Sequence, residues 1–208
     1  AMASPVFAAS SPQVAGNERI GAEQIEAVLA STNQQVFVLK PDELGRRLRL
    51  NFPDLLDARV SVWLPNVVKV QVRERQPVIM WSQGGGFTWI DETGVAFLPR
   101  GTVDNLIPVE AHNGPITAPS ASSDPLSPTP FITPDLVAAV QTLAPDAPPG
   151  ASIIYDARYG LGWTDSRGWQ VFFGERAGEM DVKLRVYDAL VQMLNSKGIR
   201  PAFISVQY

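Results

Sequence analysis

The stretch that decides the fold of the first part of this chain reads ARVSVWLPNVVKVQVR, over residues 58–73. Small and branched apolar residues recur at every second position, at Ala58, Val60, Val62 and Leu64 before a turn and at Val68, Val70 and Val72 after it. Successive side chains of a strand point to opposite faces of a sheet. The pattern therefore predicts a half-buried β-hairpin that turns at Pro65-Asn66.

Two short helical patterns precede this hairpin. Ile25, Val28 and Leu29 have the spacing of one helix face. A second pattern follows Pro41, which suits the first position of a helix, and it ends before Pro53. With a short strand near residue 15, these pieces predict a β-α-α-β-β module over residues 11–76.

From residue 77 onward the pattern changes to strands, turns and two helices. Apolar runs predict strands at 78–81, 87–90, 95–98, 152–155, 161–164, 169–173 and 202–208. Apolar periodicity predicts one helix after Thr133-Pro134 and a longer helix over about residues 179–197. The predicted fold class is α+β, with a larger mixed β-sheet module over residues 77–208.

Two segments are expected to lie outside these cores. Residues 1–10 are interpreted as an expression scar and a flexible N-terminus. Residues 114–133, which end next to Pro134, hold prolines among Ser, Thr and Ala. Such a composition buries little apolar surface, so it predicts a flexible insertion.

Composition narrows the function classes. The 208 residues are 45% hydrophobic and 18% charged, which is sufficient for a buried core. A net charge of −4 without a basic stripe argues against nucleic acid and against tight contact with anionic lipid. The absence of cysteine excludes disulfides and thiolate chemistry. No apolar run reaches about 18 residues, so no segment of this sequence is expected to span a membrane.

The residues offer little for catalysis. His112 is the only histidine, and it lies at the start of the Pro-rich segment, where it is interpreted as a surface residue. A zinc site needs several ligands, which this inventory does not suggest. Gly84-Gly85-Gly86 lacks the lysine of a phosphate-binding loop. We therefore expect no catalytic, cofactor or metal site and no small-molecule substrate.

The last strand is the sharpest candidate for partner binding. A strand at a sheet edge leaves unpaired N–H and C=O groups that can accept a further strand. The alternative is an ordinary internal strand, and the sequence leaves both open. The candidate residues are Ala202, Phe203, Ile204, Ser205, Val206, Gln207 and Tyr208.

A second candidate surface lies in the first module. Trp63 alternates onto the polar face of its strand, where it either contacts a partner or packs on the second module. Arg73, Glu74 and Arg75 form the most charged local cluster. They form either a solvated strand end with a weak ion pair or a contact to a partner or between the modules.

The order of these pieces resembles the FtsQ/DivIB family over nearly the whole chain. In the first module the resemblance is carried by Gly16-Asn17, Ile25, Phe37, Leu39, Leu48, Phe52-Pro53, Ala58-Arg59-Val60, Leu64-Pro65-Asn66, Val70 and Arg73-Glu74-Arg75-Gln76-Pro77. In the second it is carried by Trp81, Ile90-Asp91, Gly94, Phe97, Pro108, Gly174, Lys183 and Ile204-Ser205-Val206. Ser205 departs from the family, which often has Asp there, and the Pro-rich segment is longer than expected.

The resemblance implies a scaffold of the bacterial cell-division machinery. It implies that the first module is a POTRA domain and that this region is extracytoplasmic, with a single-pass membrane anchor upstream. It also implies FtsB/DivIC-type and FtsL-type partners at the septum, bound by strand addition and side-chain recognition. A POTRA-containing component of outer-membrane protein assembly or secretion is the alternative, and a cell-wall hydrolase is a third possibility that the residue inventory disfavours.

Overall fold

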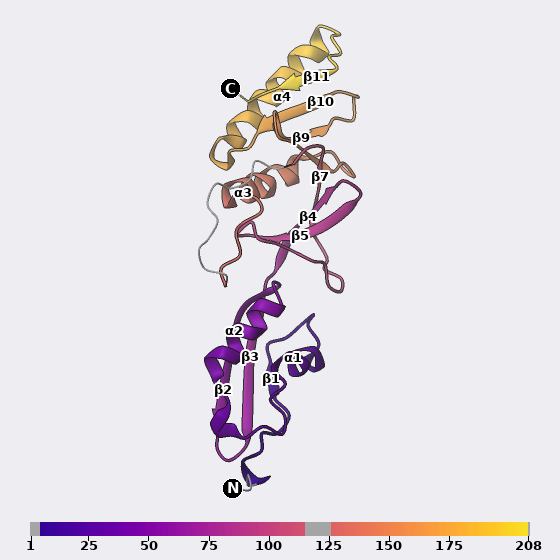
Figure 1. Ribbon diagram of the computed structural model, residues 1–208. Helices are drawn as coiled ribbons and strands as arrows, with labels where there is room; N and C mark the ends of the chain where they lie inside the picture. Colours follow the sequence, from indigo (N-terminus) through magenta and orange to yellow (C-terminus); the bar gives the residue numbers. More distant parts are fainter. Residues whose placement is uncertain (1–4, 115–125, 208) are drawn as a thin grey trace. The chain divides into compact units, whose positions relative to one another are not determined.

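The computed structural model describes residues 5–114 and 126–207 (Figure 1). Its helices and two mixed sheets confirm the predicted α+β class. Contacts between residues divide the chain into two units. The first unit comprises Ala1–Gln76, Arg100–Thr102 and Ser122–Pro128. The second comprises Pro77–Pro99, Val103–Ala121 and Thr129–Tyr208. In both, only the described residues are discussed below.

The first unit is a three-stranded sheet with two helices. Its strands are β1 (Gln13–Ala15), β2 (Leu55–Trp63) and β3 (Val67–Glu74), and its helices are α1 (Ala22–Leu29) and α2 (Pro41–Asn51). Two 3₁₀ turns, η1 (Pro5–Phe7) and η2 (Val36–Val38), complete it. The sheet order is β1-β3-β2, with β1 parallel and β2 antiparallel to β3.

The core of this unit forms on the face of the sheet that the alternation predicts. Val68, Val70 and Val72 of β3 are buried in one cluster with Ile25 of α1 and Leu48 of α2. The opposite, open face of the sheet carries the exposed polar positions of β2 and β3. Helix α2 packs closely on β2 because Gly45 has no side chain: a Cβ there would lie 2.9 Å from the carbonyl oxygen of Ala58.

One expectation for this unit is wrong in detail. Leu64 does not continue the core face, since β2 ends at Trp63 and Leu64 is exposed at the turn. Flexibility of residues 1–10 stays a prediction; within them, η1 is followed by Ala9, which is 1% exposed and donates its N–H to the carbonyl of Gln34 at 2.7 Å. Residues 1–4 lie outside the described residues.

The second unit is an eight-stranded sheet with two α-helices. Its strands are β4 (Pro77–Gln83), β5 (Gly86–Asp91), β6 (Ala96–Phe97), β7 (Ile107–Ala111), β8 (Ile153–Asp156), β9 (Gly160–Thr164), β10 (Gln170–Gly174) and β11 (Phe203–Ser205). The helices are α3 (Pro134–Leu143) and α4 (Met180–Ser196), and η3 (Ala144–Asp146) and η4 (Ala177–Glu179) are short 3₁₀ turns. The sheet order is β11-β10-β9-β8-β7-β4-β5-β6.

Strand β7 was not predicted, although it lies in the middle of this sheet. It pairs in parallel with β4 on one side and β8 on the other. Pro108 hides the strand in the sequence because proline is rare in central strands. The structure accommodates it near the start of β7, before the pairing with β8 begins at Val109.

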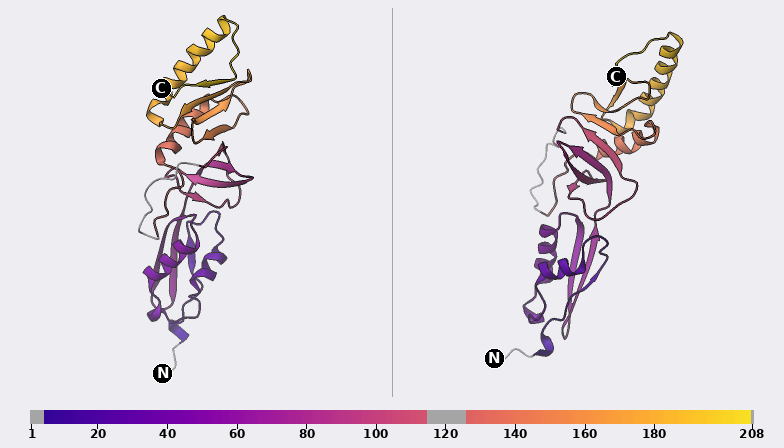
Figure 2. Two further views of the ribbon diagram at one scale, coloured as in Figure 1. Left: turned by 45° about the horizontal axis from the view of Figure 1, so that its top comes forward. Right: turned by 90° about the vertical axis from the view of Figure 1, so that its right-hand side faces the viewer.

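Both helices cover one face of the eight-stranded sheet (Figure 2). Alternate residues of the central strands, such as Trp81, Tyr155 and Trp163, are buried in a common cluster with both helices. Trp163 and Trp169 are both in this core. The end of the predicted Pro-rich insertion also joins it, because Ile132 is 1% exposed. Residues 115–125 of that insertion lie outside the described residues.

Candidate functional site

Strand β11 lies at one end of the eight-stranded sheet. It pairs in parallel with β10, with Val171 opposite Ile204, and it has no second neighbour among the described strands. The sequence left open whether this strand is an edge strand or an internal strand, and in the structure it is an edge strand. The strand is shorter than predicted, since it spans Phe203–Ser205.

Backbone groups of β11 alternate between the sheet and the free edge. The N–H of Gln170 donates to the carbonyl of Ala202 at 3.1 Å, and the N–H of Val206 donates to the carbonyl of Phe172 at 2.8 Å. In a parallel ladder the same alternate residues provide both groups to one neighbour. The N–H and C=O groups of Phe203 and Ser205 therefore face away from β10, where a further strand would pair.

The side chains of β11 sort onto the two faces of the sheet. Ile204 and Val206 are buried beneath the helices, whereas Phe203 is 41% exposed and Ser205 is also exposed. Ala202 is exposed as well, and Gln207 Nε2 donates to the carbonyl of Arg158 at 3.3 Å. Tyr208, the last predicted site residue, lies outside the described residues.

An aromatic cluster borders the free edge on the open face of this sheet. The ring of Phe203 lies 4.9 Å from that of Tyr159 and 5.6 Å from that of Phe172, measured between centroids. The guanidinium of Arg158 lies 5.2 Å from the centroid of the Tyr159 ring. Tyr159 and Phe172 could not be predicted from the sequence, because the three aromatic residues meet only through the pairing of β9, β10 and β11. Phe172 is 3% exposed, so Phe203 and the half-buried Tyr159 are the rings that an added chain could contact.

Glycine makes room for this cluster. Phe172 is paired with Gly162 on the neighbouring strand β9. A Cβ at Gly162 would lie 2.9 Å from the Phe172 ring and 2.0 Å from the carbonyl oxygen of Val171. The ring of Phe172 can therefore lie close to β9 only because residue 162 has no side chain.

A buried polar network fixes α4 against the turn between β9 and β10. The hydroxyl of Tyr187 donates to Asp165 Oδ2 at 2.7 Å and accepts the Trp169 indole N–H at 2.9 Å. Arg167 forms two hydrogen bonds to the Asp165 carboxylate, at 2.7 and 3.0 Å. These bonds satisfy the polar atoms that burial of the turn takes from water.

The network shifts two pKa values in opposite directions. Burial raises the pKa of Asp165, but hydrogen bonds from Arg167 and Tyr187 outweigh it and hold that pKa below its ordinary value. Burial and the bond to Asp165 raise the pKa of the Tyr187 hydroxyl to about 12. Tyr187 is therefore a neutral hydrogen-bond donor at neutral pH, and its role is structural.

In the first unit the structure exposes Trp63 and Arg73 on the open face of the sheet. Trp63 is 59% exposed, and its indole N–H donates to Ser61 Oγ at 3.3 Å. The ammonium of Lys69 lies 5.6 Å from the Trp63 ring centroid, a cation–π arrangement. Both Trp63 and Arg73 are therefore accessible to a partner.

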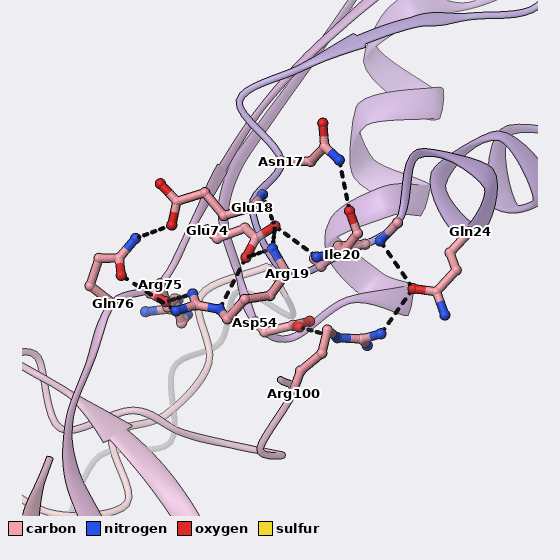
Figure 3. Close-up of polar contacts among 11 residues, drawn as sticks. Asn17, Glu18, Arg19, Ile20, Gln24, Asp54, Glu74, Arg75, Gln76 and Arg100 are labelled. Carbon is pink, nitrogen blue, oxygen red and sulfur yellow. Dashed lines mark hydrogen bonds and ion pairs between the residues drawn. The ribbon is translucent and has the colours of Figure 1, made fainter. Parts of the chain in front are cut away.

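Glu74, by contrast, is buried, and its carboxylate holds the loop that leads into α1 (Figure 3). It accepts the backbone N–H groups of Glu18, Arg19 and Ile20 at 2.7, 3.0 and 2.9 Å. The Arg19 guanidinium completes the site with an ion pair at 3.2 Å. This buried carboxylate is fully hydrogen-bonded, so it stabilises the junction between the loop and β3.

Arg75 belongs to the same inner layer (Figure 3). It is 6% exposed, its Nε donates to the carbonyl of Pro53 at 3.1 Å, and its backbone N–H donates to the carbonyl of Asp54 at 2.8 Å. Arg100 closes the network with bonds to Asp54 at 3.0 Å and to Gln24 at 2.9 Å. Partner contact by Glu74 and Arg75 stays a prediction, but their burial assigns them a structural role in the isolated chain.

No group of three or more His, Asp or Glu side chains that could hold a metal ion occurs among residues 5–114 and 126–207. A shallow hollow of about 410 Å³ lies beside β4 and β7, and Glu110 is the only titratable residue that lines it. No helix in the described part of the chain is long and apolar enough to cross a membrane.

No family model matches this chain. Residues of this chain are 33% identical over 95 positions to the Cell division protein FtsQ of Streptomyces bingchenggensis, which is 43% of this chain and 35% of that protein. They are 28% identical over 122 positions to FtsQ of Chloroflexus aggregans, which is 57% of this chain and 44% of that protein.

A third relative is similar at the same level. The FtsQ of Streptomyces griseus is 36% identical over 85 positions, which is 39% of this chain and 40% of that protein. The matched region thus spans less than half the length of each of these relatives. Four curated relatives, all named Cell division protein FtsQ and 26–36% identical, support the assignment of this chain to the FtsQ/DivIB family of cell division proteins.

Proposed function

We propose that this chain is the extracytoplasmic part of a scaffold of the bacterial cell-division machinery. In this proposal a single membrane span upstream anchors it, and it performs no chemistry. Its partners are division proteins of the FtsB/DivIC and FtsL types, gathered at the septum. The similarity to proteins named FtsQ supports the division role over the alternative in outer-membrane protein assembly.

One observation carries the proposed mechanism: the outer N–H and C=O groups of Phe203 and Ser205 are presented at a sheet edge, beside the exposed ring of Phe203 and the half-buried ring of Tyr159. A partner strand would extend the sheet through these backbone groups, which gives affinity for any extended segment. Side chains of the added strand on the open face would meet Phe203 and Tyr159. This contact would select the partner, because buried aromatic contacts concentrate binding energy.

The alternation along β11 provides a matched pair of variants. Ser205→Pro removes an N–H that faces the free edge, so it should leave the pairing with β10 intact and weaken partner binding at least tenfold. Val206→Pro removes the N–H that bonds Phe172, so it should destabilise the sheet itself. A binding titration with the FtsB/DivIC-type protein, preceded by circular dichroism of each variant, measures both effects.

The outcomes separate an edge interaction from a merely structural strand. A folded Ser205→Pro variant that binds with unchanged affinity would contradict strand addition at β11. Phe203→Ala tests selection by the aromatic cluster independently, since it leaves every backbone group in place. It should weaken binding of the cognate strand more than it weakens binding of an unrelated extended peptide.

A further inference from the structure

Three segments gather at one end of the first unit. The 3₁₀ turns η1 and η2 meet there, since the rings of Phe7 and Phe37 lie 4.9 Å apart and Ala8 forms a β-bridge with Gln35. The turn between β2 and β3 joins them, because the N–H of Ser10 donates to the carbonyl of Asn66 at 2.9 Å. Within this unit, the same end carries η1, the first described element of the chain (Figure 1).

These segments expose an unusual amount of apolar surface. Five large apolar side chains, here called the tip patch, are each between 57% and 67% exposed: Val6, Phe37, Val38, Trp63 and Leu64. Single exposed apolar residues are normal on a soluble protein, but a cluster drawn from three separate segments marks an interaction surface. Three of the five, Val6, Val38 and Leu64, are fully aliphatic and carry no polar group to satisfy.

The local structure of the tip patch suits a flat membrane surface better than a protein partner. Its residues come from two short 3₁₀ turns and the end of a hairpin, so it presents neither a long helix face nor a row of free strand groups. Trp63 adds an amphipathic ring of the kind that concentrates where a bilayer meets water. The N–H of that ring is already bonded within the chain, to Ser61.

Charge near the tip patch points to the same kind of surface. The chain carries a net charge of −4, yet the ammonium of Lys69 lies over the Trp63 ring, and Arg59 lies further along the same open face of the sheet. Arg59 also forms an exposed ion pair with Asp57 at 3.1 Å. A lysine beside an apolar tip is complementary to the anionic head groups of a bilayer.

We propose that the tip patch inserts into the head-group region of the membrane in which this protein is anchored. The inference rests on the proposed function only for the upstream anchor, and it is independent of the partner site at β11. An anchor holds the first unit at high local concentration near the bilayer, so the contact needs little affinity of its own. The general acidity of the chain therefore does not oppose it.

The chain contains a natural reporter of this contact. Trp81, Trp89, Trp163 and Trp169 are at most 4% exposed, whereas Trp63 is 59% exposed. The full chain with an N-terminal hexahistidine tag would be bound to vesicles that carry nickel-chelating lipid, which replaces the anchor. With brominated phosphatidylcholine and phosphatidylglycerol, the Trp63 emission should be quenched and shifted to the blue, and Trp63→Phe should remove the quenchable component.

Matched variants decide whether the tip patch is responsible. Replacing Phe37, Val38 and Leu64 by serine should reduce the quenching at least threefold, and removal of phosphatidylglycerol should also reduce it. The control replaces Phe87 and Leu98 by serine; both are well exposed, at 59% and 82%, but belong to the second unit. The control should be quenched like the unaltered chain.

Three results would overturn the inference. The first is no quenching on tethered vesicles, and the second is a loss of quenching in the Phe87 and Leu98 control variant as large as in the tip-patch variant. The third is a blue shift of the Trp63 emission that appears at higher protein concentration in the absence of lipid. The last result would assign the tip patch to contact between copies of the chain. Titration of β11 with the FtsB/DivIC-type protein is measured separately. Normal partner binding without Trp63 quenching would therefore refute the membrane contact while the proposed function stands.

Discussion

The carboxylate of Glu74 accepts the backbone N–H of Ile20 at 2.9 Å, although 54 residues separate the two in the sequence. The same carboxylate also bonds Glu18 and Arg19, so one buried side chain at the end of β3 fixes the loop before α1. A neutral amide would present an N–H₂ group to several backbone donors and would lose the ion pair with Arg19.

Glu74→Gln should therefore destabilise the first unit by about 2–4 kcal/mol, as expected when a buried, hydrogen-bonded charge loses its partners. Urea denaturation followed by circular dichroism measures the free energy of unfolding. Glu43→Gln is the matched control: its ion pair with Lys40 is exposed, so the change should stay within about 0.5 kcal/mol. If both substitutions lowered the free energy of unfolding by the same amount, the buried Glu74 carboxylate would contribute no more to stability than the exposed ion pair of Glu43.

The Tyr187 hydroxyl predicts an alkaline limit of stability. Its pKa rises from 10.0 to about 12 on folding, so the folded state holds its proton more tightly than the unfolded state does. This contribution is complete below about pH 10 and is lost as the pH rises through about 12. It should amount to at most about 3 kcal/mol, and Tyr187→Phe should lack it.

The measurement is the difference in unfolding free energy between the unaltered chain and Tyr187→Phe at several pH values. That difference should be constant near neutral pH and should shrink between about pH 10 and 12. A difference that stays the same throughout this range would mean that the proton on Tyr187 is not coupled to folding.

The close packing around Gly162 predicts that a side chain at this position would destabilise the sheet next to the aromatic cluster. Gly162→Ala places a Cβ 2.0 Å from the carbonyl oxygen of Val171, so β9 and β10 must separate. We expect a loss of about 2–4 kcal/mol, in the range of severe overpacking. Gly178→Ala is the control, because its Cβ would meet no atom within 4 Å. Thermal unfolding followed by circular dichroism compares them, and a well-tolerated Gly162→Ala would contradict the packing of Phe172 on β9.

Residues 5–77 should fold without the rest of the chain. The first unit has a core of its own, to which Ala9 and Val72 both contribute. The fragment lacks Arg100, which bonds the buried Asp54 carboxylate and lies over the Phe52 ring, so it should be less stable by about 1–3 kcal/mol but still folded. A cooperative urea transition and dispersed NMR signals are expected for the fragment, and a disordered spectrum would refute its independence.

Local pattern determined much of this fold. The alternation over residues 58–73 gives a hairpin with one buried face, because side chains of a strand change face at every residue. Helices α1, α2, α3 and α4 follow from apolar periodicity together with start signals such as Thr133-Pro134, where Thr133 Oγ1 accepts the N–H of Leu136 at 3.1 Å. The family resemblance also came from the order of these local pieces.

Tertiary structure alone decided which residues form the candidate sites. The sequence placed Phe203 in a strand, but only the order of the sheet makes that strand an edge and brings Tyr159 and Phe172 beside it. Likewise, the alternation along β3 places Glu74 on the inner face, but no local signal shows that its carboxylate binds the loop at Glu18, Arg19 and Ile20. Contacts between distant segments have no sequence period, so sheet edges, clusters and such polar sites arise only when the chain is folded.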